Sequence, residues 1–72
     1  MPPSLPPVSG AEAVRALEKL GLEKLRQKGS HVVMRRATSG CVVPLHRELK
    51  RGTLAAILKQ AGISAEEFRK SL

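Results

Sequence analysis

The hydrophobic period of this chain changes at Gly21, and that change limits the folds open to it. Before Gly21, apolar residues recur at the spacing of one helix face: Ala13, Val14, Leu17 and Leu20. From Leu22 to His46, apolar and polar residues alternate with a period of two, as in a strand with one buried face. A helix followed by a run of strands predicts a mixed α+β domain.

Capping signals set the bounds of the expected helices. Ser9 to Glu12 has the form of a capping box and predicts a helix that ends near Gly21. A second helix is predicted over 51–61, before Gly62, and a second capping box at 64–67 opens a short third helix through Phe68. Residues 1–8 are rich in proline, so we expect a flexible tail there and a single domain over residues 9–72.

Three strands are predicted near 22–27, 30–36 and 41–46. A two-residue turn at Lys28-Gly29 would join the first pair, and a four-residue loop over 37–40 would join the second. The first register then sets Leu25 opposite Val32 and Arg26 opposite His31. The second sets Met34 opposite Val43, Val32 opposite Leu45, and His31 opposite His46.

Both registers give the sheet the same two faces. The predicted core face holds Leu25, Val32, Met34, Cys41, Val43 and Leu45. The predicted open face holds Lys24, Arg26, His31, Val33, Arg35, Val42, Pro44 and His46. With helices covering one face of a three-stranded antiparallel sheet, the expected fold is a two-layer α+β sandwich of order αβββαα. This arrangement is similar to the double-stranded-RNA-binding fold.

The positive charge of the chain is concentrated in its middle. The formal net charge is +7, and the segment from Lys24 to Arg51 carries all of it, with eight basic residues and only Glu48 as an acid. Such clustering favours a polyanionic partner over a charge that serves only solubility. The residues proposed to contact RNA phosphates are Lys24, Arg26, Lys28, Ser30, Arg35, Arg47, Lys50 and Arg51.

Several classes of protein are excluded by composition. The single cysteine cannot form an internal disulfide, and one Cys with two His at these spacings matches no zinc site. No apolar run approaches the roughly 20 residues that a membrane span needs. We therefore expect a cytoplasmic protein with no metal, cofactor or membrane partner, and Cys41 as a core thiol.

Two histidines on a basic face permit RNA cleavage without a metal. Cleavage needs a base for the 2′-hydroxyl, an acid for the 5′-oxygen and cations around the phosphate, and imidazole exchanges protons near neutral pH. An exposed histidine on a strand of a basic protein is usually only a polar residue or a phosphate-contacting donor, so the residues alone leave the role of His31 open. At Lys50 and Arg51 the start of a helix favours an anion, although Gly52 there can serve backbone geometry alone.

Five strings of the sequence resemble the HicA (YcfA-like) family of mRNA interferase toxins. They are VSGAEAVRALEKLG, RQKGSHVVMRR, VVPLH, ELKRGTLAAILKQAGIS and EEF, in family order from about Val8 to Phe68. The resemblance implies a double-stranded-RNA-binding-like fold, ribosome-independent cleavage of mRNA, and a HicB-like antitoxin as partner. It also implies that His31 of the Gly-Ser-His motif is essential for catalysis, with Gly29 and Ser30 as the turn that positions it.

The chain departs from the family pattern at two positions, and one candidate role lies outside the resemblance. Many relatives have an aromatic residue where Leu22 stands and a second histidine where Val32 stands. Because Val32 faces the predicted core, its change should leave His31 competent. His46 receives no catalytic role from the family, so its expected part as a second acid or base depends only on the predicted register.

Three functions follow, in order of preference. The first is a toxin of a toxin–antitoxin module that acts as a metal-independent endoribonuclease, with His31 as general acid or base. The alternative is a non-catalytic module that binds double-stranded RNA by shape and phosphate contacts. A role as half of an operator-binding complex comes last, because no segment resembles a base-reading helix.

Overall fold

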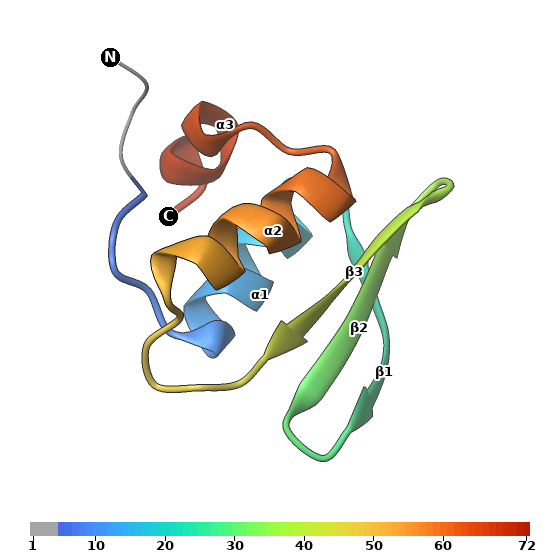
Figure 1. Ribbon diagram of the computed structural model, residues 1–72. Helices are drawn as coiled ribbons and strands as arrows, with labels where there is room; N and C mark the ends of the chain where they lie inside the picture. Colours follow the sequence, from blue (N-terminus) through green and yellow to red (C-terminus); the bar gives the residue numbers. More distant parts are fainter. Residues whose placement is uncertain (1–4) are drawn as a thin grey trace.

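The computed structural model describes residues 5–72 and shows six elements (Figure 1). In chain order they are α1 (Gly10–Lys19), β1 (Glu23–Lys28), β2 (His31–Arg36), β3 (Ser39–Pro44), α2 (Arg51–Ala61) and α3 (Ala65–Lys70). This order confirms the predicted αβββαα arrangement.

Capping interactions determine where the helices begin. At α1 the Ser9 hydroxyl accepts a hydrogen bond from the Glu12 amide (3.0 Å), and the Glu12 carboxylate accepts one from the Ser9 amide (2.9 Å). The same reciprocal pair joins Ser64 and Glu67 at α3. Both capping boxes are therefore confirmed. At Glu12 these bonds from Ser9 hold the pKa of the carboxyl below its usual value, because they stabilise the ionised form.

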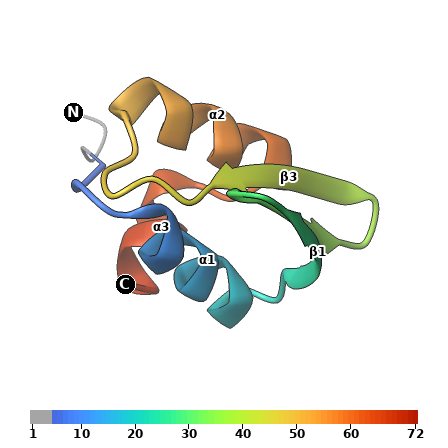
Figure 2. The same ribbon diagram turned by 90° about the horizontal axis from the view of Figure 1, so that it is seen from below.

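The sheet has strand order β1-β2-β3, with both pairs antiparallel. The helices lie on one side of the sheet and leave its other side uncovered (Figures 1 and 2). The core lies between these two layers, so the predicted two-layer α+β sandwich is confirmed. Its largest fully buried side chains are Phe68, Leu17, Met34, Leu54, Val32 and Val43.

Both predicted strand registers are wrong by two residues. The first turn is Gly29-Ser30, so Lys28 pairs with His31. The second is a two-residue turn at 37–38, so Met34 pairs with Cys41 and Val32 with Val43. A shift of two leaves each side chain on its predicted face, because strand side chains alternate with a period of two. The burial of Val32, Met34, Cys41 and Val43 confirms the core face of β2 and β3.

A β-bulge in β1 overturns two further predictions. The register slips between Lys24 and Arg26, so that Lys24 pairs with Met34 and Leu25 is the extra residue. Leu25 was expected in the core, but its side chain is 53% exposed. Lys24 was expected on the open face, but it lies on the helix-covered side, lining a hollow with residues of α1. Leu22, just before the strand, is buried at this end of the core instead.

The start of the described chain is packed against the rest of the domain. Val8 is buried, and its carbonyl accepts a hydrogen bond from the Leu49 amide (2.8 Å). The folded domain therefore includes Val8, one residue before the predicted boundary. Residues 1–4 of the predicted tail lie outside the described part of the chain.

Candidate nucleic-acid interface

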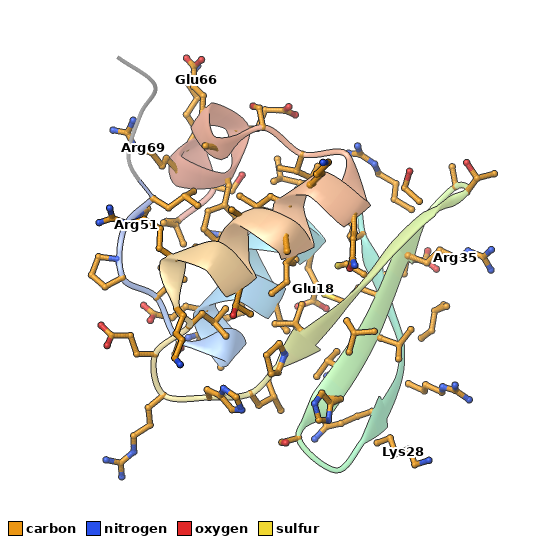
Figure 3. The ribbon with its side chains drawn as sticks, viewed as in Figure 1. Glu18, Lys28, Arg35, Arg51, Glu66 and Arg69 are labelled. Atoms are coloured by element: carbon orange, nitrogen blue, oxygen red, sulfur yellow. The ribbon has the colours of Figure 1, made fainter. Side chains whose placement is uncertain are left out.

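The uncovered side of the sheet gathers basic side chains around His31. Lys28 pairs directly with His31. Arg26 lies two residues before Lys28 on β1, and Arg35 lies four residues after His31 on β2, so both side chains are on the same side of the sheet as His31. All four residues are exposed. Figure 3 shows Lys28 and Arg35 extending from the sheet on the side away from α2. We refer to this side of the sheet as the open face, and to Arg26, Lys28 and Arg35 as the open-face cations.

None of the open-face cations forms an ion pair within 4 Å with a carboxylate of the described residues. The one ion pair within 4 Å among residues 5–72 joins Lys70 and Glu66 on α3, at 3.4 Å. Glu23 is the sole acid in the three strands, and it pairs with Arg35 at the opposite end of β1 from His31. The positive potential around His31 is thus available to an external anion.

Local contacts hold the turn that precedes His31. Gly29 has φ 59°, a left-handed conformation that glycine adopts without strain. Its carbonyl accepts a hydrogen bond from the Gln27 side-chain amide (3.0 Å), and the Ser30 carbonyl accepts one from the Leu45 amide (2.6 Å). The turn is therefore tied to both β1 and the segment after β3. As the first residue of β2, His31 is held on a fixed backbone while its side chain remains exposed.

His46 does not lie opposite His31, contrary to the prediction. The partner of His31 is Pro44, and His46 follows two residues later, past the end of β3. The physical reason is the second turn, which is two residues long rather than four and moves the β3 register accordingly. His46 is exposed, and its carbonyl accepts a hydrogen bond from the Gly10 amide (2.9 Å) at the start of α1. Both histidines still lie at the turn end of the sheet, since Leu45 contacts Ser30.

The remaining basic candidates are separated from the open-face cations. Arg47 and Lys50 lie in the segment between β3 and α2, and Arg51 begins α2. In Figure 3 Arg51 extends from the side of the molecule opposite to Lys28 and Arg35. Lys24 lies on the helix-covered side of the sheet, as described above. The structure thus brings together only three of the predicted phosphate-binding cations beside His31.

Arg36 has a structural role that sequence patterning did not identify. Its guanidinium donates a hydrogen bond to the Leu20 carbonyl (2.8 Å), which is one of the free acceptors at the end of α1. Arg36 thereby joins β2 to α1. The pairing of residues sixteen positions apart depends on tertiary packing, so no local sequence pattern could have revealed it.

Other chemical groups in the described chain are placed as follows. Cys41 is buried in the core, as predicted, and burial raises the pKa of its thiol. Over residues 5–72, no three His, Cys, Asp or Glu side chains are grouped so as to hold a metal ion. No helix in that range has the length and apolar character required to span a bilayer.

Comparison with known families gives one match. Residues 10–63 match the family described as the HicA toxin of bacterial toxin–antitoxin. The matched span runs from the first residue of α1 to just beyond α2, so it contains the whole sheet, both turns and both histidines. No curated protein matches the chain.

Proposed function

This chain belongs to the HicA toxin family, and from that premise we propose that it is the toxin of a toxin–antitoxin module that cleaves mRNA. The proposed activity is a metal-independent endoribonuclease reaction on the open face, with His31 as the catalytic group. The observation that supports it best is the position of His31, which is exposed and held beside cations that have no carboxylate partner within 4 Å.

The proposed reaction is a transesterification within the RNA strand. A base removes the proton from a 2′-hydroxyl, the 2′-oxygen forms a bond to the adjacent phosphorus, and the bond from phosphorus to the 5′-oxygen breaks. An acid gives a proton to the leaving 5′-oxygen, so the products are a 2′,3′-cyclic phosphate and a 5′-hydroxyl. Imidazole can serve in either role near neutral pH.

The open-face cations supply the electrostatic part of the mechanism. Negative charge builds on the non-bridging phosphate oxygens in the transition state, and a cation beside the reacting phosphate stabilises it by charge-assisted hydrogen bonds. Lys28 is directly opposite His31 and is the cation best placed for the reacting phosphate. Arg26 and Arg35, farther along the face, would bind neighbouring phosphates.

His46 is the candidate for the second proton transfer, and Arg47, Lys50 and Arg51 are candidates for contacts with a longer RNA. His46 lies past the end of β3, in the segment whose Leu45 amide binds the Ser30 carbonyl next to His31. A HicB-like antitoxin is the proposed protein partner. Acidic side chains on that partner would complement the open face.

The test is cleavage of labelled RNA in EDTA by the wild type and by His31→Ala. Removal of a general acid or base should lower the rate by about 10²–10⁴-fold. The control is Leu72→Ser, which changes an exposed residue near the end of the described chain and should cleave like the wild type. His46→Ala, measured across pH, should remove one limb of the rate profile if His46 is the second group.

Two outcomes would contradict the proposal. A His31→Ala protein that unfolds at the wild-type temperature and cleaves at the wild-type rate would remove His31 from the mechanism. A wild-type protein that shifts labelled duplex RNA in a gel without ever shortening it would instead support the double-stranded-RNA-binding alternative.

A further inference from the structure

Apolar side chains lie exposed in the middle of the basic open face. The large exposed hydrophobic residues of the described chain are Leu25, Val42 and Leu72, with exposed fractions of 53%, 44% and 49%. Val42 pairs with the half-buried Val33, which also pairs with Arg26, the residue next to Leu25. We refer to Leu25, Val33 and Val42 as the apolar patch, and it crosses all three strands.

The apolar patch lines a shallow hollow together with a cation. The hollow has a volume of about 440 Å³, and its lining includes all three patch residues, Arg35 and Gly40, and it also reaches Met34, Thr38, Cys41 and Gln60 of α2. Gly40 on β3 pairs with Arg35, so on that side of β2 the position opposite this arginine carries no side chain, whereas Glu23 on β1 pairs with it on the other side. An open space of this kind, apolar at its floor and bordered by a guanidinium, suits a flat aromatic ligand.

The bulge in β1 is the structural reason that Leu25 is exposed. Without the bulge, the register of Arg26 with Val33 would continue and set Leu25 opposite the buried Met34. The bulge instead leaves Leu25 as the unpaired residue and sends the charged Lys24 to the helix-covered side. Exposed apolar surface is unfavourable in water and has no part in binding phosphate, so this patch is available for a ligand group that is itself apolar.

We propose that the apolar patch seats an unpaired base of the RNA, so that single-stranded RNA is the substrate of the open face. This inference depends on one part of the proposed function, which is that RNA binds the open face, and it does not depend on cleavage. The surrounding cations call for a polyanion, and a duplex presents phosphates and sugars with its bases stacked inside. Only an unpaired strand combines phosphates for Arg26 and Arg35 with free base faces for the apolar patch.

The arrangement along β2 relates this base to the cleaved bond. His31, Val33 and Arg35 stand at alternate positions on the open face, so successive side chains are separated by roughly 6.5 Å along the strand. A base seated over Val33 would therefore lie beside the phosphate at His31. Arg35 can cover such a base with its guanidinium plane. The one aromatic residue of the chain, Phe68, is fully buried, so aliphatic side chains supply the contact.

The test uses two labelled single strands of 2′-O-methyl RNA, which cannot be cleaved because the attacking oxygen is blocked. They have equal length and equal phosphate number, and one lacks the bases at its central positions. Fluorescence anisotropy should show that the wild type binds the complete strand about fivefold more tightly, the ratio that corresponds to covering roughly 40 Å² of apolar surface.

The double variant Leu25→Thr/Val42→Thr should lose most of the preference for the complete strand, with Val33 and Arg35 left to supply the remainder, and should bind the abasic strand like the wild type. Threonine keeps strand propensity, and both positions are exposed, so the fold should be retained. Leu72→Thr removes a comparably exposed apolar residue outside the patch and should keep the full preference for the complete strand.

The outcomes separate this inference from the proposed function. If the wild type cleaves RNA but binds both strands equally, the inference is overturned while the nuclease stands. If it prefers the complete strand but never cleaves unmodified RNA, the nuclease is overturned and the base site stands. If the double variant keeps the full preference for the complete strand, the patch does not contact a base and the inference is overturned. The same holds if the double variant differs from the wild type only in self-association measured by sedimentation, because the patch would then contact a second copy of the chain.

Discussion

At the scale of single residues, Gly10 links the first helix to the end of the sheet where the turn between β1 and β2 lies. A Cβ atom at this position would overlap the Pro44 carbonyl oxygen and come within 2.7 Å of the Leu45 Cα. The Gly10 amide also binds the His46 carbonyl at 2.9 Å. Any larger residue must therefore push α1 away from the segment that carries His46.

We expect Gly10→Ala to lower the free energy of unfolding by about 2 kcal/mol or more, because overlap with backbone cannot be relieved by rotating a side chain. Urea denaturation of both proteins measures the change. Gly52→Ala is the matched control, since open space surrounds Gly52 in the first turn of α2. That variant should gain about 0.5–1 kcal/mol from helix propensity. Equal stability of Gly10→Ala and wild type would contradict the close approach.

At the scale of elements, the turn between β2 and β3 contains the one strained residue in the described backbone. Ala37 has φ 54°, and among residues 5–72 it is the only residue other than glycine with a positive φ. A left-handed conformation costs an alanine roughly 1 kcal/mol, whereas asparagine tolerates it. The strain accompanies the two-residue turn that moves His46 out of register with His31.

We expect Ala37→Asn to raise the free energy of unfolding by about 0.5–1 kcal/mol, because it removes this conformational cost without touching the core. Ala37→Val should do the reverse, since β-branched residues are the least tolerant of positive φ. Chemical denaturation of the wild type and both variants under one condition gives the order of their free energies of unfolding. The conformation assigned to this turn would be refuted if valine proved as stable as asparagine.

At the scale of the whole molecule, the distribution of charge decides where a polyanion binds. Arg35 extends from the open face, whereas Arg69 lies on α3 on the other side of the molecule (Figure 3). Both are exposed arginines of equal charge. Their removal changes the net charge identically, but only one of them borders the proposed RNA site.

We expect Arg35→Gln to reduce the salt dependence of single-stranded RNA binding by about 0.7 in the slope of log K against log salt, the value for one lost phosphate contact. Arg69→Gln should leave that slope unchanged. Anisotropy titrations at four salt concentrations measure both, using the uncleavable 2′-O-methyl strand. If the slope fell equally in both variants, net charge rather than the position of the cations on the open face would govern binding.

Much of the fold could be predicted from the sequence because its determinants are local. The capping boxes at Ser9 and Ser64 act over three residues, and the glycine at position 62 ends α2 in the left-handed conformation that its type favours. Alternation along β2 and β3 likewise assigned every side chain there to its correct face. For the same reason the exposure of His31, Arg26 and Arg35 on one face could be predicted. The predicted register was wrong by two residues, and a shift of two does not move a side chain to the other face.

The sequence by itself thus determined the order of elements, the helix starts and the two faces of the sheet, because each depends on residue type and period. Only the tertiary structure decided the position of the first turn, the length of the second, the bulge at Leu25 and the position of His46. A period of two cannot distinguish registers that differ by two residues, and a bulge depends on how β1 packs against its neighbours. In the folded chain the bulge leaves Leu25 unpaired and exposed on the side of the sheet that carries the open-face cations, while Leu22 is buried in the core.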